Sequence, residues 1–116
     1  MALTVVCLVD RRRNTLARGL RKAGIIVIET FTTDQAVAVC VSNHIDAIVL
    51  DQEFFIEVDG WSVAQSIKLV RPSACVLLAT RARVLAERPP KGVDTVLPSD
   101  NIPAIIKRVK TLALAS

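Results

Sequence analysis

The sequence predicts a single α/β domain, residues 1–116, in which helices cover both faces of a doubly wound parallel sheet. Three continuous apolar runs suit strands that are buried on both faces of such a sheet. These runs are Val6–Val9, Ala47–Leu50 and Cys75–Ala79. Helical patterns alternate with the runs through short connections, which is typical of a parallel sheet built from βα units. A chain of 116 residues has room for one such core.

Five segments are predicted to be strands because they are short, apolar and mostly rich in branched aliphatic residues. In chain order they are Leu3–Val9, Ile25–Ile28, Asp46–Leu50, Ala74–Ala79 and Thr95–Leu97. Glycine 24 lies where the first helix has to end before the second strand begins.

Four segments are predicted to be helices from the 3.6-residue spacing of their apolar side chains. The first is Asn14–Ala23. The second opens with a capping box at Thr32–Gln35 and runs to about Ser42. The third and fourth are Gly60–Val70 and about Ile102–Leu114. Asp100 is the expected N-cap of the last helix, and Pro103 suits its first turn.

Two segments do not fit the regular pattern. The stretch 52–59 is predicted to be an irregular loop, and 81–88 is barely two helical turns long before Pro89–Pro90 ends any helix. We therefore expect the fourth crossover helix to be shortened or irregular.

The candidate site lies where three buried strands end. Asp10, Asp51 and Thr80 each follow an apolar run directly. Ligands and chemistry collect outside the carboxyl ends of the strands in open α/β sheets. Two carboxylates and a hydroxyl are therefore expected to converge there.

Several classes of protein are excluded or disfavoured. No apolar run approaches the roughly 18 residues of a membrane span, and no signal peptide is recognised, so we expect a cytoplasmic protein without a membrane partner. Cys7, Cys40 and Cys75 lie within apolar patterns and are expected to be buried, reduced thiols. The chain also lacks phosphate-binding glycine motifs and a Ser/His/Asp nucleophile set, so no enzyme is predicted.

In order and spacing, five short motifs resemble the receiver domain of bacterial two-component signalling, over about Thr4 to Leu112. They are Leu8–Asp10, Ile48–Asp51, Asp59–Gly60, Leu78–Thr80 and Gly92–Asp94. The resemblance implies a flavodoxin-like sheet in the order 2-1-3-4-5. It also implies that Asp51 descends from a phosphoacceptor and that Thr80 corresponds to the switch hydroxyl.

The chain departs from the receiver pattern where the chemistry is demanding. Arg11 stands where a second acidic residue belongs, and Ser99 stands where a Lys belongs. Val96 occupies the position of the aromatic switch residue. Glu53 lies two residues after the phosphoacceptor, in a loop about one residue longer than usual, and joins Asp10 in the expected acidic pocket.

These departures bear on metal binding and on phosphorylation. The resemblance implies Mg²⁺ ligation by Asp10 and Asp51, yet a guanidinium now replaces an anion beside them. Phosphoryl transfer needs a metal and a Lys to stabilise the transferring oxygens. No cofactor is therefore certain, Mg²⁺ binding is expected to be weak or lost, and phosphorylation of Asp51 is in doubt.

One hypothesis gives Arg11 a role in the site. Its guanidinium could bind Asp10, Asp51 or Glu53 with paired hydrogen bonds and replace the cation permanently, which would hold the domain in one state. The alternative is that Arg11 points into solvent beside Arg12 and Arg13.

The function predicted is a degenerate receiver that acts through protein–protein contacts, with a histidine kinase or an output domain as the kind of partner expected. One alternative is a phosphorylation-competent receiver that accepts a phosphoryl group on Asp51 from a histidine kinase. A second is a small nucleotide- or flavin-binding protein of the same fold, since fold alone does not fix function.

The charge of the chain favours an acidic protein as that partner. The formal net charge is +4. Basic residues are expected at the carboxyl edge (Arg11, Arg12, Arg13, Arg81 and Arg83) and on the last helix (Lys107, Arg108 and Lys110). No helix-turn-helix, stacking aromatic set or zinc spacing supports direct nucleic-acid binding. Because the fourth crossover is short and basic, a monomer or a dimer through a non-standard face is expected.

Overall fold

The computed structural model describes residues 3–9, 15–51, 60–80 and 92–115. Its sheet has five parallel strands in the order β2-β1-β3-β4-β5. The strands are β1 (Thr4–Leu8), β2 (Ile26–Thr30), β3 (Ala47–Asp51), β4 (Val76–Ala79) and β5 (Thr95–Leu97). The doubly wound sheet and its strand order are as predicted.

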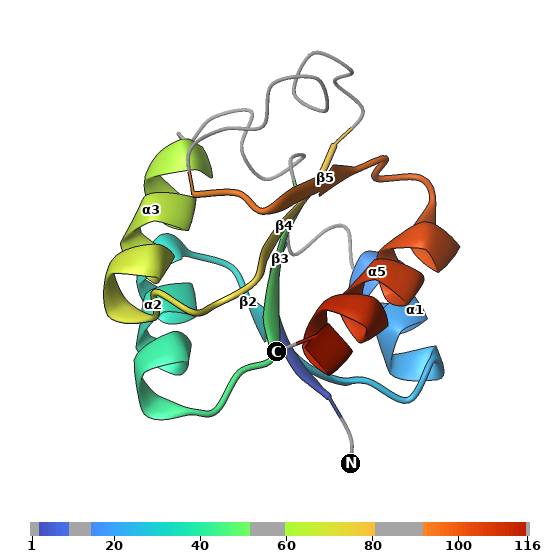
Figure 1. Cartoon of the computed structure of the whole chain (residues 1–116), viewed down its shortest axis with the longest axis horizontal. Helices are drawn as coiled ribbons and strands as arrows, with labels where there is room; N and C mark the ends of the chain where they lie inside the picture. Colours follow the sequence, from blue (N-terminus) through green and yellow to red (C-terminus); the bar gives the residue numbers. More distant parts are fainter. Residues whose placement is uncertain (1–2, 10–14, 52–59, 81–91, 116) are drawn as a thin grey trace.

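Helices form a layer on each face of this sheet (Figure 1). One layer contains α1 (Thr15–Lys22) and α5 (Ile102–Ala115), and the other contains α2 (Thr33–Ser42) and α3 (Gly60–Val70). The three central strands β1, β3 and β4 are almost completely buried, which explains why their sequences read as unbroken apolar runs.

Each face of the sheet has its own core, because successive side chains of a strand point to opposite faces. On the α2–α3 side, Val6, Leu8, Ile48 and Leu50 pack against apolar side chains of both helices. On the α1–α5 side, the alternate residues of the same strands pack against Leu16, Leu20, Ile105, Val109 and their neighbours. The sheet is therefore held from both sides by aliphatic packing.

The first helix ends at a glycine, as predicted. Gly24 has φ +85°, a left-handed conformation that favours glycine. Its N–H donates to the carbonyl oxygen of Arg21 (3.0 Å), and the N–H of Ile25 donates to that of Leu20 (3.2 Å). These two hydrogen bonds are those of a Schellman cap, and Ile25 and Leu20 both belong to the same apolar core.

Of the caps predicted for two other helices, one is confirmed and one is not. Thr32 caps α2 as predicted, since its hydroxyl accepts from the N–H of Gln35 (3.1 Å). The prediction for α5 was wrong: Asn101, and not Asp100, caps that helix. The amide oxygen of Asn101 accepts from the N–H of Ala104 (3.2 Å), three residues on, which is the spacing that a capping side chain spans.

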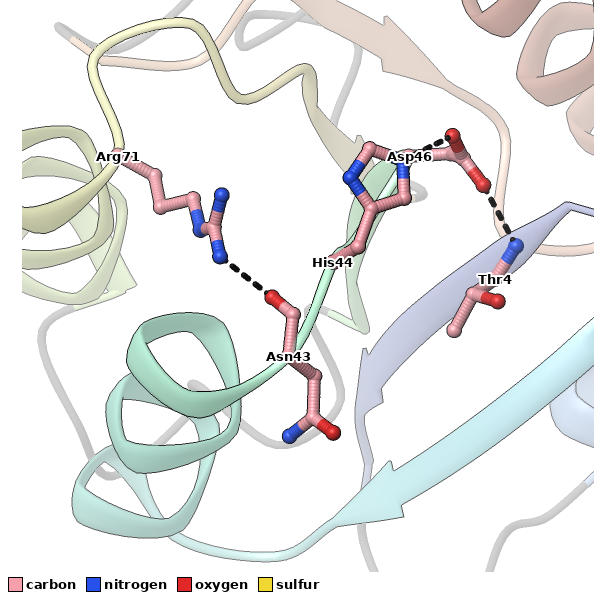
Figure 2. Close-up of polar contacts among 5 residues, drawn as sticks. All are labelled: Thr4, Asn43, His44, Asp46 and Arg71. Carbon is pink, nitrogen blue, oxygen red and sulfur yellow. Dashed lines mark hydrogen bonds and ion pairs between the residues drawn. The ribbon is translucent and has the colours of Figure 1, made fainter.

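Two aspartates close the amino edge of the sheet in the same way. The backbone N–H of Asp46 donates to the carbonyl oxygen of Thr4 (2.8 Å), and its carboxylate accepts from the Thr4 N–H (2.8 Å; Figure 2 shows this second bond). Likewise, the backbone N–H of Asp94 donates to the carbonyl oxygen of Val76 (2.9 Å), and the Asp94 carboxylate accepts from the Val76 N–H (2.8 Å). Each carboxylate thus satisfies the first N–H of a neighbouring strand, which would otherwise lack a partner.

Cationic side chains of α3 and of its C-terminal turn tie the same edge together. The guanidinium of Arg71 donates to the carbonyl oxygens of Cys40 and Asn43, at the C-terminal end of α2 (Figure 2 shows the bond to Asn43). The ammonium of Lys68 donates to the Asp94 carboxylate (2.8 Å) and to the carbonyl oxygen of Ala74 (2.6 Å). These bonds join α2, α3 and the starts of β4 and β5.

The predicted irregular loop at 52–59 and the shortened fourth crossover at 81–88 lie outside the described residues. Within the described ranges, none of the helices is both long enough and apolar enough to cross a bilayer.

We expect Asp94→Ala to lower the free energy of unfolding by about 1–3 kcal/mol, because it leaves the Val76 N–H and the Lys68 ammonium without their shared acceptor. Asp94→Asn should cost less, since its amide oxygen still accepts from Val76. Asp100→Ala serves as the control, because the Asp100 carboxylate forms no ion pair or hydrogen bond with the described residues. Urea denaturation measures all three; equal losses for Asp94→Ala and Asp100→Ala would contradict this role of the carboxylate.

Candidate functional site at the carboxyl edge

Asp51 is the last residue of β3 and lies at the carboxyl edge of the sheet. Its side chain is buried, with 7% of the residue exposed. In the strand register it lies opposite Ala79, the last residue of β4. Because the whole strand before it is buried and pinned between β1 and β4, the backbone of Asp51 is fixed.

Thr80 and Ser99 come together at the ends of the next two strands. The N–H of Thr80 donates to the carbonyl oxygen of Leu97 (2.9 Å), and the N–H of Ser99 donates to that of Thr80 (3.2 Å). The parallel ladder of β4 and β5 thus continues one step beyond the strands. Asp51, Thr80 and Ser99 therefore follow one another along the edge, at the carboxyl ends of β3, β4 and β5.

The hydroxyl of Ser99 is in an unfavourable environment. Its Oγ is inaccessible to solvent and has no hydrogen-bond partner among the described residues. A buried hydroxyl without a partner costs about 1–3 kcal/mol relative to one in water. Where the resemblance would place an ammonium, the described structure thus has a small, uncharged and unsatisfied group.

Val96 lies on the inner side of the last strand. It is partly buried and packs against the core on the α2–α3 face, opposite Leu78 in the register. A branched aliphatic side chain held in this way has none of the reach of an aromatic ring. The position expected for an aromatic switch residue is therefore filled by a packing residue.

Other predicted site residues, namely Asp10, Arg11 and Glu53, lie outside the described residues. Val9, directly before Asp10, is completely buried, and its N–H donates to the carbonyl oxygen of Thr30 (3.0 Å). The backbone leading to Asp10 is thus fixed beside β2 at the carboxyl edge. The contact predicted between Arg11 and the acidic pocket stays a prediction.

Of the two carboxylates that the resemblance assigns to a Mg²⁺ ion, the described part contains Asp51 alone. Within the described ranges, no three His, Cys, Asp or Glu side chains lie close enough together to hold a metal ion. The expectation of weak Mg²⁺ binding depends on Arg11 beside Asp10, which both lie outside the described residues, so it stays a prediction.

Cys7, next to the site on β1, has no features of a reactive thiol. It is completely buried, and burial raises the pKa of its thiol to about 12, with a further increase from the charge of Glu29. Because the thiolate is the reactive form, Cys7 is inert in the folded protein at neutral pH. Cys40 is also buried, and its pKa is raised by the same desolvation. Cys75 is partly exposed, so the predicted burial holds for two of the three cysteines.

Comparison with solved structures shows that the chain has the fold of response-regulator receiver domains. A receiver domain from Methanospirillum hungatei superposes with a TM-score of 0.81 and 13% identity, over 99% of this chain and 96% of that one. A receiver domain of a Pseudomonas aeruginosa sensor histidine kinase has a magnesium ion in its active-site cleft. It superposes with a TM-score of 0.82 and 17% identity, over 97% of this chain and 98% of that one.

Two further structures extend the comparison. The response regulator TrrA of Thermotoga maritima, in complex with Mg²⁺ and beryllium fluoride, gives a TM-score of 0.79 and 22% identity, over 97% of this chain and 99% of that one. A streptococcal redox sensor, from a family that evolved from two-component response regulators, gives a TM-score of 0.79 and 13% identity. The match covers 98% of this chain and 52% of that one. No protein-family model and no curated protein sequence matches the chain.

The Ser99 hydroxyl generates a prediction about stability. Ser99→Ala should leave the free energy of unfolding unchanged or raise it by up to about 1 kcal/mol, because it removes a buried polar atom that has no partner. Thr30→Ala is the contrasting variant: the Thr30 hydroxyl is buried and donates to the Cys7 carbonyl oxygen (3.0 Å), so its loss should destabilise the protein. Chemical denaturation compares the two. A loss of more than about 1 kcal/mol for Ser99→Ala would mean that the hydroxyl is bonded after all.

Proposed function

We propose that this chain is a receiver-like signal-transduction module that acts by binding other proteins and in which Asp51 is a poor phosphoacceptor. The observation that carries the proposal is the uncharged Ser99 at the end of β5, beside Thr80 and in line with Asp51. The receiver fold and the buried carboxylate support descent from a phosphorylated switch. The replacement of the expected Lys by Ser99 supports the loss of phosphoryl transfer to Asp51.

The physical argument concerns charge at the transferring oxygens. A phosphoryl group that moves onto a carboxylate spreads negative charge over three oxygens, and a protein stabilises that charge with fixed cations. The Ser99 hydroxyl supplies no charge, and Arg11 stands where an acidic metal ligand would be needed. We expect Mg²⁺ to bind weakly at this edge, and we assign no step to it.

The kind of partner follows from the fold neighbours by analogy. One of them is the receiver domain of a sensor histidine kinase, and another belongs to redox sensors evolved from response regulators. A histidine kinase or an output domain is therefore the class of partner that we propose for this chain. The module itself would be a binding protein and not an enzyme.

A phosphorylation-competent receiver is the second candidate. It is favoured by the pair that remains, since Asp51 is buried at the end of β3 and Thr80 follows β4 directly. The two candidates differ in whether Asp51 is modified at a useful rate when a phosphodonor is present.

Intact-mass spectrometry after incubation with acetyl phosphate and Mg²⁺ separates the two candidates. We expect little phosphorylated protein from the natural chain. The double variant Arg11→Asp, Ser99→Lys restores both missing charges and should raise the rate of modification about tenfold or more, since a single stabilising donor can be worth a factor of about 100 or more.

Adding Asp51→Asn to the double variant is the control and should abolish the gain. Efficient, Mg²⁺-dependent modification of the natural chain that disappears in Asp51→Asn would refute the proposal and establish the second candidate.

A further inference from the structure

The positive charge of this protein is concentrated on two neighbouring helices. α1 and α5 together carry six basic residues and no acidic residue, and the basic ones are Arg18, Arg21, Lys22, Lys107, Arg108 and Lys110. The other nine basic residues and all eleven acidic residues of the chain lie elsewhere. The net charge of +4 is therefore due to this pair of helices, since the remainder of the chain is slightly acidic.

Five of these six cations are exposed and pair with none of the carboxylates in the described ranges. Arg21 is engaged, because its guanidinium pairs with the Glu29 carboxylate on β2 at 2.7 Å. The other five are exposed, and none of them forms an ion pair with a carboxylate of the described residues. We call these five residues (Arg18, Lys22, Lys107, Arg108 and Lys110) the basic face.

The two helices are packed tightly enough to act as one surface. Gly19 on α1 lies directly against Ile102 on α5, and a β-carbon at Gly19 would lie 2.6 Å from a methyl carbon of that side chain. Figure 1 shows α1 and α5 side by side on the same face of the sheet. Ile102 and Ile106 are only partly buried, so apolar surface accompanies the charges.

The opposite layer has a different character. α2 carries one acidic residue, Asp34, and no basic one, while α3 carries one basic residue, Lys68, which pairs with Asp94. Exposed side chains such as Ala38 and Gln65 offer neutral positions on these helices. The protein thus has one strongly basic helical layer and one nearly neutral layer, and the second provides matched control sites.

We propose that the basic face of α1 and α5 is a docking surface for an acidic protein segment. Charge complementarity selects the acidic partner, because the five exposed cations of the basic face repel any basic surface and steer an anionic one toward this layer. The partly exposed Ile102 and Ile106 favour a protein over a polyphosphate, since protein interfaces combine an apolar centre with a charged rim. Neither helix has an aromatic side chain on which a base could stack. This inference rests on the proposed function and specifies that its protein partner is acidic.

The experiment measures binding of a fluorescent acidic amphipathic peptide by anisotropy at about 0.15 M salt, where the Debye length is about 8 Å. The peptide has Leu at helical spacing and Glu at its other positions. Three double variants of the full chain are compared: Arg18→Gln with Lys22→Gln, Lys107→Gln with Lys110→Gln, and the control Ala38→Glu with Gln65→Glu. Each lowers the net charge by two, from +4 to +2.

We expect saturable binding of the peptide to the natural chain, weakened about 2- to 10-fold by either basic-face variant, as two exposed ion pairs would allow. The control should bind within about twofold of the natural chain. Circular dichroism of each variant confirms that it is folded. The phosphorylation test above does not involve this face, so failure here leaves that result standing.

Three outcomes would overturn the proposal. The first is no saturable binding of the peptide to the natural chain. The second is equal weakening by the control and the basic-face variants, which would mean that net charge alone decides. The third is tighter binding of a DNA duplex, or of vesicles of phosphatidylcholine with phosphatidylglycerol, than of the peptide, which would assign the face to another class of partner.

Discussion

Burial of β1, β3 and β4 on both faces is the constraint on which the rest of this structure depends. Their side chains can leave water only if helices cover both sides of the sheet, so the chain has to supply helices to two layers. A parallel sheet follows, because the helices after β1, β2 and β3 each return the chain to the edge at which the next strand starts. All five strands then end at one edge, which brings Asp51, Thr80 and Ser99 into line.

The two edges of the sheet differ in how their polar groups are satisfied. At the amino edge, Asp46 and Asp94 each accept a neighbouring strand's first N–H, and Arg71 caps the end of α2. At the carboxyl edge, Ser99 has a buried hydroxyl without a partner in the described structure. Fully paired polar groups stabilise, whereas unpaired ones cost free energy. The amino edge therefore supports the fold, whereas the described part of the carboxyl edge includes one buried polar atom that does not.

The sequence was most informative where one physical effect dominated. Strands buried on both faces must be continuously apolar, so β1, β3 and β4 were predicted within about two residues at each end. Asp51 and Thr80 lie at the expected edge. The glycine at position 24 marked the end of α1, because few other residues tolerate its positive φ.

Features that depend on distant partners could not be predicted in this way. The clamps of Asp46 and Asp94 require the strand register, which a local pattern does not contain. Asp100 and Asn101 are both good capping residues, and only the exact start of α5 decides between them. The sequence indicated the cations of α5. That they form one surface with Arg18 and Lys22 depends on the packing of α1 against α5.

The central claim is that the carboxyl edge keeps the shape of a receiver site and has lost its response to phosphate. Two-dimensional ¹H–¹⁵N NMR of the labelled chain, titrated with beryllium fluoride and Mg²⁺, tests this directly, because the reagent mimics an aspartyl phosphate without any transfer step. The account predicts that the amide signals of Asp51, Thr80 and Ser99 stay in place. Saturable shifts of these signals that are absent in Asp51→Asn would contradict it.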